Sequence, residues 1–137
     1  MNLVLDASVA LSWCFEDERT DYADSLLDAL SEVGAAAPEL WAFEVANGLL
    51  VAMRKKRIDE DQLTGALEFL HGLPIELSPT PKDRSQGRIL ELAFESGLSV
   101  YDASYLELAE RLDLPLASLD LRLRKAAKQL GRLHQPN

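Results

Sequence analysis

The sequence predicts an α/β fold in which helices cover both faces of a central, mainly parallel sheet. Short apolar stretches of strand length recur along the 137 residues, and longer stretches with helical spacing of apolar residues separate them. Neither a repeat of fixed period nor a low-complexity segment interrupts this alternation. Strands separated by helices need right-handed crossover connections, which produce parallel neighbours covered on both faces. Because the length suits one compact core, we expect a single domain over residues 1–137.

The first half of the chain is expected to contain two strands and three helices. In chain order they are a strand over 3–5, helices over 8–14 and 21–33, a strand over 35–37 and a helix over about 40–56. Gly34 ends the second helix, since glycine readily adopts the conformation found just after a helix. The residues expected to face inward are Tyr22, Leu26, Leu27 and Leu30 in one long helix, and Phe43, Ala46, Leu50 and Met53 in the other.

The second half is expected to add four helices and two further strands. They are a helix over 60–70, a strand over 75–77, helices over 82–96 and 101–112, a strand over 115–119, a helix over 121–130 and an additional edge strand over 132–134. Asp59 and Gln62 have the spacing of a capping box at the start of the helix over 60–70. Gly97 is expected to end the helix over 82–96. The inward residues are expected to be Leu63, Leu67 and Leu70, followed by Ile89, Leu92 and Ala93.

Composition points to a protein that stays in the cytoplasm and has no membrane partner. No apolar stretch approaches the roughly 20 residues that span a bilayer, and the first six residues lack a basic region and a cleavage site. Cys14 is the only cysteine, which excludes an internal disulfide framework and a zinc site made of thiolates. We interpret Cys14 as a small buried apolar residue rather than a reactive thiol.

The net charge of −9 argues against a protein that finds nucleic acid through its overall field. Any contact with phosphates must therefore be local. Two basic groups are available: the run Arg54 to Arg57, and a cluster in the last helix and just after it, which comprises Arg122, Arg124, Lys125, Lys128 and Arg132. Each group is either a solvated helix surface or a local contact for phosphates.

Four acidic residues occupy positions that this fold would bring together. Asp6 and Asp120 each end a predicted strand, and ligands of open α/β sheets bind beyond the carboxyl ends of the strands. Glu44 lies in a largely apolar helix, where a carboxylate needs a positive partner. Asp102 opens a helix, so it is either a cap or a fourth ligand. Carboxylates are the ligands that Mg²⁺ and Mn²⁺ prefer, which predicts metal-assisted phosphoryl chemistry.

Three polar residues near these acids have two interpretations. Asn47, three residues after Glu44, either orients a carboxylate or a metal-bound water, or makes an ordinary helix hydrogen bond. Ser8 and Ser118, each two residues from an aspartate, either bond the carboxylates or cap helices. His71 and His134 lack partners at the spacing of metal ligands. The aromatic residues Trp13, Phe15 and Trp41 are expected in the core or at an interface rather than in a base-stacking platform.

Four short motifs in this order resemble those of PIN domains. They are Leu3-Val4-Leu5-Asp6-Ala7-Ser8, Glu44-Val45-Ala46-Asn47, Tyr101-Asp102-Ala103-Ser104-Tyr105 and Ser118-Leu119-Asp120. The resemblance extends over nearly the whole chain and is closest to the VapC-type ribonuclease toxins of bacterial toxin-antitoxin pairs. One departure is Ser118, where the family commonly has threonine; the hydroxyl is kept.

The resemblance implies that residues 1–137 form one PIN domain with Asp6, Glu44, Asp102 and Asp120 as catalytic metal ligands and Ser8, Asn47 and Ser118 in support. It further implies Mg²⁺ or Mn²⁺ as cofactor, RNA as substrate, and products with a 5′-phosphate and a 3′-hydroxyl. A cognate antitoxin and a second copy of the chain are the implied protein partners. The segment Trp13 to Phe15 and the helix around Trp41, Phe43 and Leu49 are expected to supply the apolar surface for them.

Three other functions compete with this one. A structure-specific DNA nuclease would need additional elements that grip DNA, for which the chain has little room. A non-catalytic PIN-like binding module would not need all four acids. A phosphate acceptor of the response-regulator kind would explain Asp6 but leaves Glu44 without a role.

Overall fold

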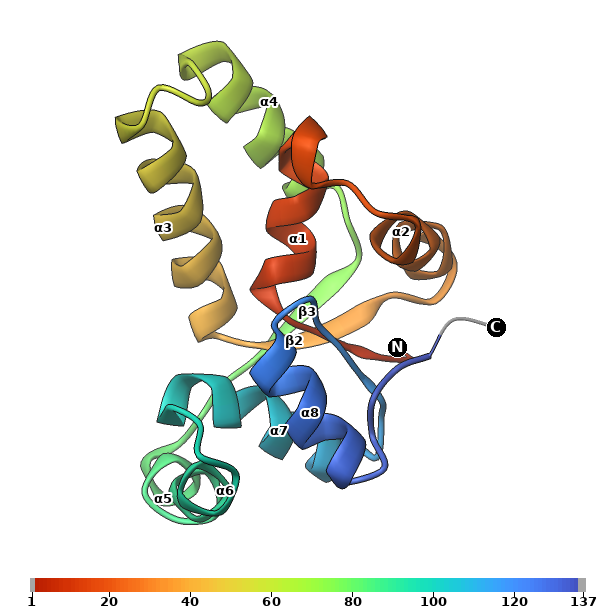
Figure 1. The fold of residues 1–137 in the computed structure, drawn as a ribbon, viewed down its shortest axis with the longest axis vertical. Helices are drawn as coiled ribbons and strands as arrows, with labels where there is room; N and C mark the ends of the chain where they lie inside the picture. Colours follow the sequence, from red (N-terminus) through yellow and green to blue (C-terminus); the bar gives the residue numbers. More distant parts are fainter. Residues whose placement is uncertain (1, 136–137) are drawn as a thin grey trace.

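A four-stranded parallel sheet forms the centre of the computed structural model, which describes residues 2–135 (Figure 1). Its strands are β1 (Val4–Leu5), β2 (Ala35–Pro38), β3 (Ile75–Ser78) and β4 (Leu116–Ala117). They lie in the order β3-β2-β1-β4, with Val4 opposite Ala36 on one side and Leu116 on the other. The predicted α/β class and parallel sheet are confirmed.

Helices pack on both faces of this sheet. They are α1 (Ala7–Cys14), α2 (Asp21–Val33), α3 (Leu40–Arg54), α4 (Glu60–His71), α5 (Lys82–Ser85), α6 (Arg88–Ser96), α7 (Val100–Leu112) and α8 (Leu121–Gln129), with a short 3₁₀ turn η1 (Glu16–Glu18). Figure 1 shows α1, α3 and α4 on one side of the strands and α5 to α8 on the other. No helix within residues 2–135 has the length and apolar character needed to cross a membrane.

Right-handed crossovers explain this division of the helices. The chain advances from β1 to β2 and β3 in one direction, then returns past β1 to β4. A reversal of direction places the later helices on the opposite face, because the handedness of each connection is fixed. The strand order therefore reverses between β1 and β4. In open α/β sheets the crevice at such a point is where ligands bind.

Several predicted helix ends are confirmed by their capping contacts. The Asp59 side chain accepts a hydrogen bond from the Gln62 backbone N–H and the Gln62 side chain accepts one from Asp59, which completes the capping box of α4. Gly97 ends α6 in the left-handed region at φ 66°, where an L-residue would be strained. Of the two interpretations of Asp102, the helix cap is excluded, since the Ser99 side chain caps α7 instead.

The inward face of α3 differs from the predicted one. Its buried residues are Trp41, Val45, Leu49 and Ala52, whereas the predicted stripe begins with Phe43, whose side chain is 81% exposed. Because α3 carries two apolar stripes, periodicity alone cannot decide which one packs on the sheet. Trp13, Phe15, Trp41 and Leu49 all belong to the core. Of the residues expected to form the partner surface, Phe43 is therefore the side chain that remains well exposed.

Two predicted elements in the second half are corrected. The helix expected over 82–96 is divided into α5 and α6 at Gln86 and Gly87. A Cβ at Gly87 would collide with the backbone carbonyl oxygen of Asp83, so the glycine permits a close turn that a continuous helix would not contain. The edge strand expected over 132–134 is reduced to a single parallel bridge between Leu116 and Leu133.

Cys14 is half-buried, and burial raises the pKa of its thiol to about 11. A thiol with this pKa holds almost no thiolate at neutral pH, and thiolate is the reactive form. The structure thus supports the interpretation of Cys14 as an unreactive apolar residue.

Candidate functional site

The first and last acids of the predicted site lie at the point where the strand order reverses. Asp6 directly follows β1, and the loop from Ser118 to Asp120 directly follows β4. The two strand ends are joined by a backbone hydrogen bond from the Asp6 N–H to the Ala117 carbonyl oxygen at 3.0 Å. The carboxyl ends of β1 and β4 therefore bring together residues that are more than a hundred positions apart.

Asp6 is the most buried of the four acids, with 6% of its surface exposed. Its Oδ2 accepts hydrogen bonds from the Ser8 Oγ at 2.6 Å and the Ser118 Oγ at 2.7 Å. The Ser8 Oγ also accepts a hydrogen bond from the Leu119 backbone N–H, and the Ser118 Oγ accepts one from the Asp120 backbone N–H, both at 3.0 Å. Two hydroxyls thus fasten the loop after β4 to the Asp6 carboxylate. Of the two interpretations of Ser8 and Ser118, the structure supports the bond to a carboxylate.

Glu44 lies half-buried on α3, and its Oε1 accepts a hydrogen bond from the hydroxyl of Tyr105 on α7. Tyr105 is fully buried, and burial next to two acids raises the pKa of its hydroxyl, so it remains a proton donor. Sequence reasoning missed this partner. The available signal was spacing, because Tyr105 follows Asp102 by three residues and therefore shares its helix face.

Asp102 is half-buried in the first turn of α7. Because Ser99 supplies the cap, the carboxylate of Asp102 is not needed at the helix end. Burial, followed by the charge of Asp120, raises the pKa of Asp102, while Ser99 and Arg122 act in the opposite direction. Asp102 therefore lies close enough to Asp120 for their charges to interact.

Asp120 and Asn47 are more exposed than the other predicted site residues. The Oδ1 of Asp120 accepts the Leu123 backbone N–H at 3.0 Å and so caps α8. Asn47 lines a surface cleft together with Glu44. Asp120 is thus at the site but also has a structural role, and Asn47 lies at its margin.

The charges of three acids act on one another. Burial is the main cause of the raised pKa values of Asp6 and Glu44, and the Asp102 charge raises both further. Asp6 also raises the pKa of Glu44. Like charges held near each other in a partly desolvated place are stabilised by a cation. Asp6, Glu44 and Asp102 therefore form one electrostatic cluster, with Asp120 adjoining Asp102.

The donor set fits a hard divalent cation in its chemistry. All four predicted ligands offer carboxylate oxygens, which Mg²⁺ and Mn²⁺ prefer. Within residues 2–135, no three side chains of His, Cys, Asp or Glu lie close enough to enclose a metal ion by themselves. Mg²⁺ commonly keeps several waters and binds one or two carboxylates together with substrate phosphate, so a closed protein cage is not required.

Comparison with known proteins identifies the family. The sequence pattern of the PIN domain matches residues 3–129. The chain belongs to the PIN domain family. It is 33% identical to Ribonuclease VapC3 of Pyrobaculum aerophilum over 127 residues, which cover 90% of this chain and 92% of that protein. The predicted resemblance to PIN domains of the VapC type is confirmed.

Two crystal structures share the fold of this PIN domain. PAE2754 from Pyrobaculum aerophilum superposes with a TM-score of 0.66 and 23% sequence identity, covering 95% of this chain and 86% of that one. VapBC2 from Rickettsia felis, bound to a DNA fragment from their promoter, gives a TM-score of 0.65 with 14% identity, covering 97% and 96%. At these identities the likeness concerns the fold.

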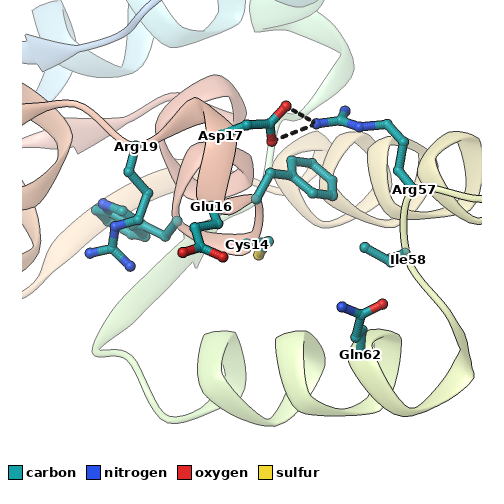
Figure 2. Close-up of a pocket in the computed structure, with 9 residues that line it drawn as sticks. Cys14, Glu16, Asp17, Arg19, Arg57, Ile58 and Gln62 are labelled. Carbon is teal, nitrogen blue, oxygen red and sulfur yellow. Dashed lines mark hydrogen bonds and ion pairs between the residues drawn. The ribbon is translucent and has the colours of Figure 1, made fainter.

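The basic groups differ in their distance from the acids of the PIN domain. Arg57 pairs with Asp17 at 3.1 Å and with Glu18 at 2.8 Å, and Figure 2 shows it reaching the Asp17 carboxylate. The run that contains Arg57 begins ten residues after Glu44, about 15 Å along a helix. By contrast, Arg122 and Lys125 are exposed on α8, and the charge of Arg122 lowers the pKa of Asp102.

Metal-free protein is expected to lose stability as the pH rises from about 4 toward 7. Burial places the pKa values of Asp6, Glu44 and Asp102 above their ordinary values of 3.8, 4.5 and 3.8. Between the ordinary and the raised values the folded chain binds more protons than the unfolded chain, so the free energy of unfolding falls across that interval. Thermal unfolding in EDTA at pH 5 and pH 7 should show a Tm lower by a few degrees at pH 7.

The variant Asp6→Asn separates this effect from the general acidity of the chain. It keeps a side chain of similar shape but has no charge to bury, so its Tm should depend less on pH than that of the wild type. Added Mg²⁺ should raise the Tm of the wild type at pH 7 more than that of the variant. Equal pH dependence in both proteins would show that the buried charge of Asp6 is not responsible.

Proposed function

We propose that this PIN domain, residues 1–137, is a Mg²⁺- or Mn²⁺-dependent endoribonuclease and the toxin of a toxin-antitoxin pair. The observation that carries the proposal is the buried Asp6 carboxylate, fixed by Ser8 and Ser118 at the reversal of strand order and flanked by Glu44 and Asp102. Its support comes from a relative that is named a ribonuclease, VapC3, at 33% identity. We expect the protein to act in the cytoplasm.

In the proposed enzyme the acids bind the metal, and other residues of the site hold the acids in place. Asp6, Glu44, Asp102 and Asp120 would hold the metal, with Asn47 at the edge. Ser8 and Ser118 fix the Asp6 carboxylate, and Tyr105 fixes that of Glu44. When bound, a divalent cation stabilises charge on the scissile phosphate and makes water a stronger nucleophile. Through these hydrogen bonds the two serines and Tyr105 hold the carboxylates of Asp6 and Glu44 in place for such a cation.

The direct test is cleavage of single-stranded or loop RNA by purified protein with and without metal. We expect cleavage with Mg²⁺ or Mn²⁺, none in EDTA, and recovery when the metal is returned. DNA of the same sequence serves as the matched substrate. Cleavage that persists in the chelator would contradict metal dependence, cleavage of DNA alone would favour the DNA nuclease, and no cleavage of either would favour a non-catalytic module.

Charge reversal on α8 is expected to weaken RNA binding more than charge reversal at the end of α3. Arg122 and Lys125 are exposed on α8, and the charge of Arg122 acts on Asp102, so Arg122→Glu with Lys125→Glu should weaken binding at least about tenfold and reduce its dependence on salt. Cleavage positions should not change, because phosphate contacts position RNA without reading its sequence. Arg54→Glu with Lys55→Glu is the matched control. Similar losses for both pairs would show that position relative to the acids does not matter.

Protein partners form the second part of the proposal. We propose that the chain forms a homodimer and binds a cognate antitoxin. The solved structure of VapBC2 has the same fold. On this chain, Leu50 and Val51 of α3 are 43% and 38% exposed, which leaves apolar surface for another chain to cover.

A further inference from the structure

Two exposed aromatic residues each come directly before one of the acids in the sequence. Phe43 precedes Glu44 on α3, and its side chain is 81% exposed. Tyr101 precedes Asp102 on α7, and its side chain is 68% exposed. Neither ring contributes much to the core, and exposed apolar side chains that lie together, unlike single ones, mark binding surfaces.

The two rings line the same cleft. A surface hollow of about 400 Å³, which we call the aromatic cleft, is lined by Leu40, Phe43, Glu44, Asn47 and Tyr101. A neighbouring cavity of about 320 Å³ shares Leu40, Phe43 and Tyr101 with it and extends to Ile89 and Ser104. Hollows of a few hundred Å³ with apolar walls and a few polar groups suit small planar ligands. Because Glu44 lines the aromatic cleft, a ligand in it would lie beside the acid cluster.

The charge of the protein limits what part of an RNA can bind there. The chain carries a net charge of −9, and the cleft itself contains an acid, so it repels phosphates. Nucleobases are uncharged, and they stack on aromatic side chains. In single-stranded RNA the bases are free to turn away from their neighbours, which a duplex does not allow. The uncharged part of an unpaired nucleotide therefore complements the aromatic cleft.

We infer that Phe43 and Tyr101 form a stacking site for an unpaired nucleobase next to the scissile phosphate. The inference rests on the proposed ribonuclease function, since it takes the acids to be the place where the phosphate lies. The Asn47 side chain offers both a donor and an acceptor at the rim of the cleft, which would let it contact the edge of the bound base. The site would make base identity near the cut a determinant of cleavage.

The experiment measures binding of a labelled single-stranded RNA to the full chain in EDTA. Phe43→Ala and Tyr101→Ala should each weaken binding by about 10-fold, within the range found for losing one stacked base. Phe43→Trp and Tyr101→Phe keep a ring and should retain affinity. Phe94→Ala is the matched control, because Phe94 is 90% exposed on α6 but lines neither hollow. The salt dependence of binding should not change in any of them.

Abasic RNA makes the test specific for a base. Replacing the nucleotide next to the mapped cut by an abasic one should weaken binding to the wild type by a similar factor. The same replacement should have little further effect on Phe43→Ala or Tyr101→Ala, because both changes remove one contact. Binding by these variants equal to that of the wild type would overturn the inference. The inference would also be overturned if the losses from the ring substitution and from the abasic nucleotide simply added.

Three further outcomes separate this inference from its alternatives. If the alanine variants turn a dimer into a monomer in light scattering yet bind RNA normally, the rings are covered by a second copy and the inference fails. If metal-dependent cleavage occurs and neither Phe43→Ala nor Tyr101→Ala changes RNA binding or cleavage, the proposed function stands and the inference fails. If RNA binds through the rings but is never cut, the ribonuclease proposal fails and the stacking site remains.

Discussion

Replacing Asp6 by asparagine is expected to reduce RNA cleavage at least about 100-fold while the protein stays folded. Asp6 is 6% exposed, and one oxygen of its carboxylate accepts hydrogen bonds from two serine hydroxyls. An amide of the same shape has an oxygen that can still accept, but it has no charge with which to hold a divalent cation. Because a neutral amide is easier to bury than a charge, the thermal stability of the metal-free variant should equal or exceed that of the wild type.

Asp102→Asn should give a comparable loss, since its carboxylate is not used as a helix cap. Asp28→Asn on the exposed face of α2 is the control for removing one negative charge, and it should cleave as the wild type does. The measurements are the initial rate of cleavage at saturating Mg²⁺, the affinity for Mn²⁺, and the melting curve of each variant. Wild-type rates for either Asp6→Asn or Asp102→Asn would show that the assignment of that ligand is wrong.

The sequence was most informative where local rules decide the structure. The capping box of Asp59 and Gln62 and the stop at Gly97 depend on neighbouring residues, and both were predicted. The break at Gly87 was not, because a helical pattern continues across it and the reason for the break is a close approach to the Asp83 carbonyl. Likewise, the choice between two apolar stripes on α3 depends on what the rest of the chain presents to that helix.

The same distinction between local and long-range contacts applies to the acids of the site. Asp6 and Asp120 could be placed at one edge because each ends a strand and parallel strands end together. The contacts that fix them could not be predicted, since the hydroxyl of Ser118 reaches Asp6 across 112 positions of sequence. For Tyr105 the sequence offers only its spacing from Asp102, and spacing does not show which acid its hydroxyl meets. Its bond to Glu44 depends on where the fold places α7 relative to α3, which no local rule supplies.

Binding of an antitoxin is expected to silence the enzyme and to depend on a groove between α3, α4 and β3. This groove has a volume of about 440 Å³, and its apolar lining includes Trp41, Val45, Leu67, Leu70, Leu73 and Ile75. Apolar side chains of a bound segment would leave water on entering this groove, which favours binding.

The antitoxin tail would cover this groove as an amphipathic helix or an extended segment and reach the acids with an arginine. A guanidinium pairs with carboxylates through two hydrogen bonds and would compete with the metal for Asp6, Glu44 and Asp102. Inhibition should therefore weaken as Mg²⁺ is raised. If a gene adjacent to that of this chain encodes the antitoxin, its product should co-purify with the chain, and cleavage assays across a Mg²⁺ titration would measure the competition.

A substitution in the groove separates the binding of the antitoxin from catalysis. Ala46 is exposed and lines the groove, so Ala46→Glu should leave the fold and the basal cleavage unchanged. It should weaken inhibition by the antitoxin at least about tenfold, because it places a charge where apolar surface would be buried. Ser25→Glu, at an exposed position of α2, is the control for an added charge. Full inhibition of Ala46→Glu would place the antitoxin elsewhere, and a chain whose cleavage is indifferent to the adjacent gene product would contradict the toxin-antitoxin proposal.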